Sequence, residues 1–299
     1  MYEPSALAGL VVTAVLTAGL YALMSYGLAL VYGVMKIINL AHAGTMMLSA
    51  FVVLSLNRTA LHLDPVLGSI VSAALFFLLG MGLYRVAVRR VINAPPIASL
   101  LLLFGVWLCA QNLAYLIWGS EDQSIVTPYT FTTVDLGDLK IAVSRLIPFF
   151  ISLVALAALT WFLRSTDLGK AIRAVSQNAM SARLVGVRSE RVATIAFGLG
   201  SALSAFAGGL LTLLFSFNPD FGGTFQLKSF AIIVLGGLES LPGVALGAVV
   251  LAVVESFSIL IPGWRGSLVN LLAFSMLVAA LVLLPGGIAS LLERRGQNE

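Results

Sequence analysis

Long stretches without a single charged residue constrain this chain more than any other feature of its sequence. A lipid hydrocarbon core about 30 Å thick needs roughly 20 apolar residues of helix. Stretches of about this length recur at Leu7–Val34, Ile37–Leu56, Pro65–Leu83, Pro96–Trp118, Leu146–Leu163, Val192–Ser216, Pro242–Ile261 and Gly266–Pro285. With 60% hydrophobic and 10% charged residues, a water-soluble core is excluded, because too little polar surface would remain to cover it. The sequence therefore predicts an all-α polytopic membrane protein.

The basic residues orient the predicted helices, because lysine and arginine are retained on the cytosolic side of a membrane. The segments 85–95 and 164–191 are rich in arginine and lysine, whereas 119–145 is rich in aspartate and glutamate. This pattern places 119–145 outside, the N-terminus outside and the C-terminus in the cytosol. No linker, low-complexity tract or internal repeat divides the chain, so residues 1–299 are expected to form a single transmembrane domain.

One apolar segment is too short to be an ordinary membrane helix. Thr224–Leu238 would give roughly 22 Å of helix, and the glycines and proline of Gly236–Gly243 break any continuation. We therefore predict a broken or re-entrant segment near residues 224–243, within a total of eight or nine transmembrane helices. Lys228 is expected to extend toward the membrane surface. Irregular backbone at membrane depth is stable only inside protein or beside a wet cavity, so this segment is expected to lie against a pathway.

Several polar residues lie within the apolar stretches, where a central charge costs about 2.5–3.5 kcal/mol. Glu239 and Glu255 are candidates for a solvated pathway or a subunit interface. The alternatives are a cytosolic turn for Glu239, and for Glu255 a cap on a partner helix or a position facing water near the exit. Asn39 and His42 are equally consistent with a substrate contact and with a helix cap beside a histidine at headgroup level. The candidate translocation pathway thus comprises Asn39, His42, Gly44, Gly236, Gly237, Glu239 and Glu255.

No motif for catalysis or nucleotide binding accompanies these residues. Gly169-Lys170 is followed by Ala171, and Arg164 stands where a phosphate-binding loop requires glycine. No metal site or cofactor is expected, because the two histidines, His42 and His62, are assigned to opposite sides of the membrane. The chain is therefore expected to be a conduit rather than an enzyme. An ion-coupled secondary transporter or channel, with Glu239 or Glu255 carrying a proton, remains an alternative, whereas a scaffold would not need broken helices.

The polar segment 164–191 is too polar to cross the membrane and too long for a simple connector. Ala171–Val175 and Asn178–Val185 are expected to form short helices, with breaks at Gly169 and Gly186. Small and apolar residues beside arginines suit docking into a groove of a soluble partner. The alternative is a basic loop held at anionic lipid headgroups. Docking is favoured, because small residues next to a glycine permit close approach.

Three segments of the chain resemble the high-affinity branched-chain amino acid ABC transporter permeases of the LivH type: Tyr26–Phe51, Leu168–Val187 and Phe230–Ser256. With matching hydropathy between them, the resemblance covers nearly the whole chain. It implies a permease subunit of an ABC importer for branched-chain or other hydrophobic amino acids, in the bacterial inner membrane. The partners it implies are a second homologous permease, two ATP-binding cassette subunits, which hydrolyse the ATP, and a periplasmic substrate-binding protein, with no nucleic acid.

The segment that contains Ala182 and Gly186 in an A-x-x-x-G arrangement is similar to the family's coupling loop, which meets the ATP-binding subunit. The resemblance implies that ATPase coupling involves Gly169, Arg173, Ala174, Gln177, Asn178, Ala182, Leu184, Gly186 and Val187. Glu239 departs from the family pattern GG-small-G-S-x-x-G, because a carboxylate replaces a small residue. A permease for urea, short amides or other small solutes of the same family is therefore the alternative.

Overall fold

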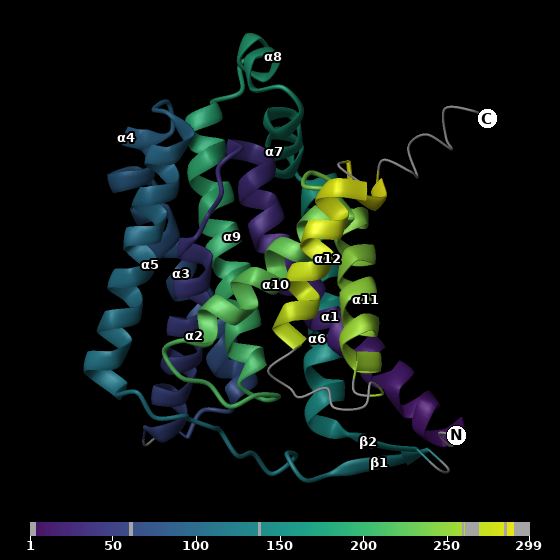
Figure 1. Ribbon diagram of the computed structural model, residues 1–299. Helices are drawn as coiled ribbons and strands as arrows, with labels where there is room; N and C mark the ends of the chain where they lie inside the picture. Colours follow the sequence, from purple (N-terminus) through teal and green to yellow (C-terminus); the bar gives the residue numbers. More distant parts are fainter. Residues whose placement is uncertain are drawn as a thin grey trace, which may run out of the picture.

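Helices that run back and forth between two ends of the molecule make up most of the fold (Figure 1). The structure is a computed structural model and describes residues 4–59, 62–136, 139–258, 260, 269–283 and 286–289. Its longer helices are α1 (Pro4–Met35), α2 (Ala41–Arg58), α3 (Pro65–Leu83), α5 (Pro96–Trp118), α6 (Val143–Ser165), α9 (Ser189–Leu211), α10 (Phe221–Gly236), α11 (Leu241–Ser258) and α12 (Val269–Leu283). The short elements are the π-helical turn η1 (Tyr84–Val88), α4 (Arg89–Val91), strands β1 (Thr133–Leu136) and β2 (Leu139–Ala142), α7 (Asp167–Gln177) and α8 (Ala179–Leu184).

Among the described residues, seven helical segments are long and apolar enough to cross a membrane, and these contain α1, α3, α5, α6, α9, α11 and α12. The shorter or more polar helices α2 and α10 run among them (Figure 1), which agrees with the predicted eight or nine. The central helix is α9, because 72% of the residues in its most apolar 18-residue stretch are buried inside the protein. The corresponding share for α5 is 11%, so most of the surface of α5 is available to lipid. The chain is a multi-pass membrane protein.

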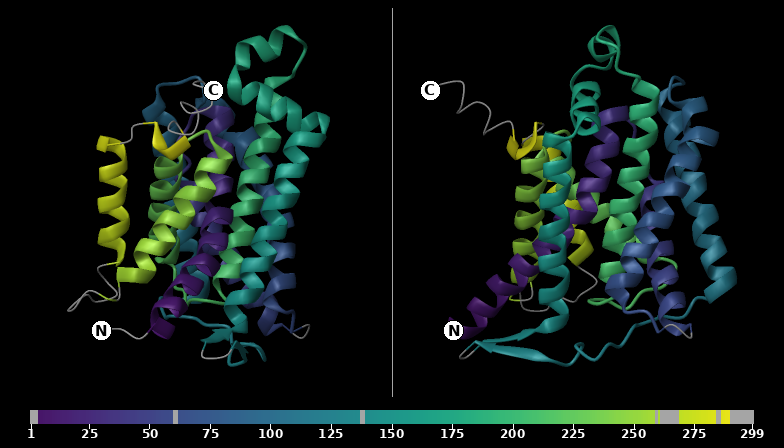
Figure 2. Two further views of the ribbon diagram at one scale, coloured as in Figure 1. Left: turned by 90° about the vertical axis from the view of Figure 1, so that its right-hand side faces the viewer. Right: turned by 180° about the vertical axis from the view of Figure 1, so that it is seen from behind.

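Two features mark the opposite ends of this bundle (Figures 1 and 2). The antiparallel hairpin of β1 and β2 lies at the end where α1 begins, which we call the hairpin end. The helices α7 and α8 lie at the other end, which we call the α8 end, and α12 runs toward it. The segments 119–145 and 164–191 therefore lie on opposite sides of the bundle, as their charges predict. The hairpin itself was not predicted.

The helices are interrupted at two places inside the bundle. Residues 36–40 are not helical, so α2 begins at Ala41 rather than near Ile37. The predicted helix cap by Asn39 is wrong, because Leu40 occupies the capping position and makes no side-chain hydrogen bond there. The second interruption follows α10, which ends at Gly236 as predicted, although it begins earlier, at Phe221. Gly237 then adopts a φ of 105°, in the left-handed region that favours glycine.

Small residues on α9 let neighbouring helices approach closely. A Cβ atom on Gly200 would lie 2.8 Å from the Gly27 carbonyl oxygen of α1, and one on Gly208 would collide with the Met46 backbone of α2. Between these two glycines, the Ser204 hydroxyl donates a hydrogen bond to the His42 carbonyl at 3.0 Å. The row Gly200, Ser204 and Gly208, spaced by four residues, is therefore a packing face, as such rows usually are in membrane proteins.

Gly236 of α10 and Gly243 of α11 approach each other most closely among the glycines of the described ranges, and an added Cβ on either residue would collide with the carbonyl of the other. We expect Gly236→Ala to destabilise the protein by about 1–3 kcal/mol, because the two backbones must separate. The measurement is the thermal unfolding midpoint of the purified chain in detergent. Gly82→Ala is the matched control, since no atom lies within 4 Å of its added Cβ. Because alanine favours helix over glycine by about 1 kcal/mol, the control is expected to shift in the opposite direction.

Two loops at the hairpin end are fastened to each other and to α5. Gln123 and Phe217 exchange backbone hydrogen bonds of 2.8 and 2.9 Å, which join the loop before β1 to the loop before α10. Gln111 and Tyr115 of α5 both donate to the Asp220 carboxylate, at 2.7 and 2.8 Å. The loop that leads from α9 into α10 is therefore held at the end of α5.

Candidate functional site

Helix α7 folds back onto the end of α6. The Thr166 hydroxyl caps α7 by accepting a hydrogen bond from the Gly169 backbone N–H at 3.0 Å. A Cβ on Gly169 would collide with the Phe162 carbonyl and lie 2.6 Å from the Leu163 Cα. Gly169 therefore fixes how closely α7 packs on α6. The predicted break at Gly169 is wrong, because the residue lies within the first turn of α7.

Helix α8 is a compact unit closed by hydrogen bonds at both ends. Asn178 caps it, since the side-chain oxygen accepts from the Ser181 N–H at 2.9 Å. At the other end Gly186 turns the chain with a φ of 86°, and the Val187 N–H donates back to the Ala182 carbonyl at 3.0 Å. The predicted break at Gly186 is therefore confirmed. Only glycine adopts this φ without strain, so the turn requires a glycine at position 186.

The residues predicted to couple the chain to a partner fall into a buried group and a solvent-exposed group. Gly169 and Ala182 are buried, and Ala174 and Val187 are half-buried, so these four shape the segment from within. The exposed members of the predicted set are Arg173, Gln177, Asn178, Leu184 and Gly186. The predicted coupling segment thus consists of an internal framework and an accessible surface.

Three large apolar side chains form the outermost surface of α8 and its end, which we call the apolar tip. Met180, Leu184 and Val185 are 69%, 83% and 79% exposed. Sequence reasoning did not select Met180, although its spacing of four residues from Leu184 places both on one helix face. The apolar tip lies beyond the ends of the long helices (Figure 1), so lipid tails do not account for it.

The predicted pathway residues at the start of α2 lie in the packed interior. Asn39 and His42 are 2% and 1% exposed, and the Gln226 side chain of α10 donates to the Asn39 carbonyl at 3.1 Å. The Asn39 side-chain oxygen and both His42 ring nitrogens have no hydrogen-bond partner among the described residues. Gly44 packs against Trp107 and Ala110 of α5. In the described part of the chain, no three His, Cys, Asp or Glu side chains are placed to hold a metal ion.

The two predicted pathway carboxylates have different environments. Glu239 lies in the turn between α10 and α11, where its carboxylate is 2.5 Å from the Lys36 ammonium and both side chains are about half exposed. Glu255 of α11 is 11% exposed and pairs with Lys228 of α10, whose ammonium lies 3.0 Å from one carboxylate oxygen and 3.1 Å from the other. The expected extension of Lys228 toward the membrane surface is therefore wrong.

Tyr21 of α1 completes a buried cluster with this ion pair. Its hydroxyl donates to Glu255 Oε2 at 2.6 Å and accepts from Lys228 Nζ at 2.7 Å. The Tyr21–Lys228–Glu255 cluster therefore joins α1, α10 and α11 inside the membrane-spanning part of the bundle. Buried charges are stable only when they are paired and hydrogen-bonded, which explains why Lys228 does not reach water.

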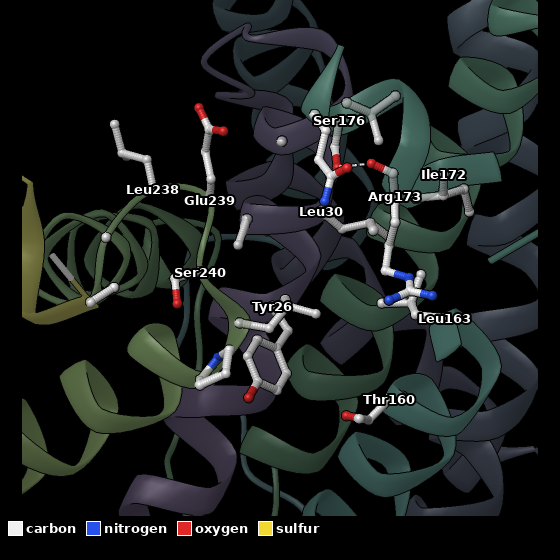
Figure 3. Close-up of a pocket in the computed structure, with 18 of the residues that line it drawn as sticks. Tyr26, Leu30, Thr160, Leu163, Ile172, Arg173, Ser176, Leu238, Glu239 and Ser240 are labelled. Atoms are coloured by element: carbon white, nitrogen blue, oxygen red, sulfur yellow. Dashed lines mark hydrogen bonds between the residues drawn. The ribbon is translucent and has the colours of Figure 1, made fainter. Parts of the chain in front are cut away.

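One pocket brings predicted residues of both sets together (Figure 3). Its volume is about 740 Å³, and it lies between α1, the α6–α7 junction and the α10–α11 turn. Arg173 and Gln177 of the coupling set and Gly237 and Glu239 of the pathway set line it. The remaining predicted pathway residues, Asn39, His42, Gly44, Gly236 and Glu255, do not line this pocket.

Comparisons with known proteins agree with these features. Residues 10–283 match the family model described as the permease component of the branched-chain amino acid transport system. The high-affinity branched-chain amino acid transport system permease protein LivH of Escherichia coli K12 is 28% identical over 280 residues, which is 90% of both chains. The corresponding protein BraD of Pseudomonas aeruginosa is 28% identical over 283 residues, 90% of this chain and 91% of BraD.

A more distant similarity covers part of the chain. The autoinducer 2 import system permease protein LsrC of Escherichia coli O9:H4 is 29% identical over 154 residues, 48% of this chain and 44% of LsrC. The family match, in contrast, extends over nearly all of the membrane helices described above. The chain therefore belongs to the family of branched-chain amino acid transport permeases.

Proposed function

We propose that this chain is the transmembrane permease subunit of an ABC importer for branched-chain or other hydrophobic amino acids. The observation that carries the proposal is the apolar tip, which exposes Met180, Leu184 and Val185 at the end of a segment that packs on the membrane helices. Exposed apolar side chains on a short helix favour docking into a groove of another protein. The membership of the chain in the permease family supports the same function.

ATP hydrolysis takes place in partner subunits, because the sequence of this chain contains no phosphate-binding loop. The proposed assembly contains this chain, a second homologous permease, two ATP-binding cassette subunits and a periplasmic substrate-binding protein. The apolar tip and the exposed coupling residues Asn178 and Gly186 contact a cassette subunit. The exposed coupling residues Arg173 and Gln177 line the pocket between α7 and the α10–α11 turn. The buried coupling residues Gly169, Ala174, Ala182 and Val187 hold the segment in shape.

Movement of the cassette subunits is transmitted through α7 in this proposal. Because Gly169 holds α7 tightly against α6, a displacement of the apolar tip moves α6 with it. Helix α7 faces the α10–α11 turn across the pocket. The glycines Gly236, Gly237 and Gly243 supply local hinges at this turn. Asn39, His42, Gly44, Glu239 and Glu255 stay assigned to the translocation pathway, which the two permeases form together.

The proposed location is the bacterial inner membrane, with residues 1–299 forming a single transmembrane domain. The α8 end faces the cytosol, because the basic segments gather there. The N-terminus then lies in the periplasm and the C-terminus in the cytosol. The hairpin end, with the acidic segment 119–145, faces the periplasmic binding protein.

The substrate is assigned by family membership. LivH and BraD are named as branched-chain amino acid permeases, whereas LsrC is named for autoinducer 2 import. Permeases of related sequence therefore serve different small solutes, and a permease for urea or short amides is the second candidate. An ion-coupled transporter is less favoured, because the carboxylate of Glu255 is already paired with Lys228 rather than free to carry a proton.

The test is uptake of radiolabelled leucine, valine, isoleucine and urea by cells that express this chain together with the proposed partner subunits. We expect leucine uptake to stop when the Walker lysine of the cassette subunit is replaced, and to persist for several minutes after addition of a proton uncoupler while ATP is maintained by glycolysis. Uptake that collapses with the uncoupler but survives the cassette substitution would contradict the proposal. Pull-down of the tagged chain is expected to recover the cassette subunit and the second permease.

A further inference from the structure

The pocket beside α7 has the dimensions of a small-molecule site. Its volume of about 740 Å³ lies within the range of ordinary ligand pockets. Apolar side chains such as Leu30, Leu163 and Val234 form much of its wall, and α7 and the α10–α11 turn close it from two sides. A ligand in this position would contact both the coupling segment and the turn that interrupts the helices.

The charge of the pocket is set by two arginines. The guanidinium of Arg173 projects from α7 into the pocket, toward Leu163 and Tyr26 (Figure 3). Neither Arg173 nor Arg164, which also lines the pocket, has an ion-pair partner within the described ranges. Glu239 does not neutralise them, because its carboxylate is paired with Lys36 and points away from Tyr26 (Figure 3). Guanidinium groups bind carboxylates through two parallel hydrogen bonds, so the pocket favours a carboxylate.

The hydroxyl group of Tyr26 faces the same space. Tyr26 is 7% exposed and lines the pocket, and its hydroxyl makes no hydrogen bond within the described part of the chain. Thr160, to the right of Tyr26 in Figure 3, donates its hydroxyl proton to the Leu156 carbonyl at 2.8 Å and keeps its lone pairs as acceptors. The Tyr26 hydroxyl is therefore available to donate a hydrogen bond to a ligand or to water in the pocket.

We propose that this pocket binds an amphipathic carboxylate, a small molecule with one carboxylate group and a branched or linear apolar body. Arg173 binds the carboxylate, the apolar body lies against Leu30 and Leu163, and the Tyr26 hydroxyl donates to the second carboxylate oxygen. Because the occupant touches α7 and the α10–α11 turn, it holds the coupling segment against the turn and restrains its movement. The coupling role of α7 and the assignment of the α8 end to the cytosol rest on the proposed function; the binding itself does not.

The first experiment measures binding to the full chain in phosphatidylcholine nanodiscs, without cassette subunits. The probes are isocaproate, leucine and isoamylamine, which share a branched apolar body. Isocaproate carries only a carboxylate, leucine carries a carboxylate and an ammonium group, and isoamylamine carries only an ammonium group. We expect isocaproate and leucine to bind and isoamylamine not to bind. Arg173→Gln is expected to weaken isocaproate binding about tenfold or more, as for loss of a hydrogen bond to a charged group. Arg188→Gln, an exposed arginine outside the pocket, is the matched control and is expected to bind like the parent.

The second experiment follows occupation of the pocket beside α7 by chemical labelling. The chain has one cysteine, Cys109, so Cys109→Ser gives a background into which Ser176→Cys is introduced in the pocket wall. Isocaproate is expected to slow maleimide labelling at position 176 at least fivefold and to leave labelling of a second variant, Ser189→Cys outside the pocket, unchanged. The Tyr26→Phe change in the same background is expected to require more isocaproate for the same protection.

Three results would overturn the proposal: binding of isoamylamine as tight as that of isocaproate, unchanged isocaproate binding in Arg173→Gln, or loss of isocaproate binding in nanodiscs that contain phosphatidylglycerol. The last result would mean that an anionic lipid headgroup occupies the pocket. The binding and labelling experiments need neither ATP nor transport. A failure here therefore leaves the importer assignment standing, and a failure of ATP-driven uptake leaves this binding site standing.

Discussion

Replacing Glu255 by glutamine is expected to destabilise the protein by about 3–5 kcal/mol, because Lys228 is then left as an unpaired charge in the interior. Lys228 and Glu255 are only 8% and 11% exposed, and the ammonium lies 3.0 Å from the carboxylate. Tyr21 cannot replace the lost charge, since a neutral hydroxyl supplies only a hydrogen bond. The measurement is the thermal unfolding midpoint of the purified chain, followed by size-exclusion chromatography in detergent.

Two controls separate the buried charge from the loss of any one side chain. The double variant Lys228→Met with Glu255→Leu removes both charges and is expected to recover much of the lost stability. Lys36→Met with Glu239→Gln removes an ion pair of which both partners are about half exposed, and is expected to change stability by no more than about 1 kcal/mol. A Glu255→Gln variant as stable as the parent would show that the ion pair does not hold the three helices together.

Substituting Leu184 by aspartate is expected to abolish ATP-driven uptake while leaving the chain inserted in the membrane. Leu184 is 83% exposed, so the change does not disturb the interior, but it places a charge in the centre of the apolar tip. Loss of a central contact in an interface costs about 2 kcal/mol or more, which corresponds to roughly 30-fold weaker association with the cassette subunit. Gly186→Arg is expected to have the same effect, because an arginine is strained at a φ of 86°.

The matched control for the apolar tip is Phe131→Asp, which changes a side chain of similar exposure, 82%, near the hairpin end. Co-purification of the cassette subunit is expected to fall in Leu184→Asp and Gly186→Arg and to stay at the parental level in Phe131→Asp. Membrane insertion is checked by the amount of chain in the membrane fraction. Equal recovery of the cassette subunit in all variants would contradict the assignment of α8 as its docking site.

Hydropathy and charge were sufficient to predict the layout of the membrane helices and the place where α10 stops. These features depend on local composition: a run of apolar residues is long enough to span, and glycines with a proline end a helix wherever they stand. The capping of α8 by Asn178 and the turn at Gly186 are also local, and the short helix in that region was predicted close to its observed bounds.

The features that sequence reasoning missed depend on contacts between distant residues. Lys228 and Glu255 are 27 positions apart and Tyr21 is 207 positions from Lys228, so no spacing rule connects them. Gly169 looks like a helix break in isolation, yet its lack of a side chain is needed for the contact with α6. Asn39 has the residue type of a helix cap but lies one residue too early and contacts Gln226 instead.

The fastened loops at the hairpin end have a mechanical consequence. Gln123, Phe217 and Asp220 hold the outer ends of α5 and α9 together, whereas the α8 end of the bundle presents a pocket and a helix pair that projects from it. A force applied to α8 therefore acts on a lever whose fulcrum lies at the opposite membrane face. Displacements are therefore expected to grow with distance from the fulcrum, so a force on α8 moves the α8 end more than the fastened hairpin end.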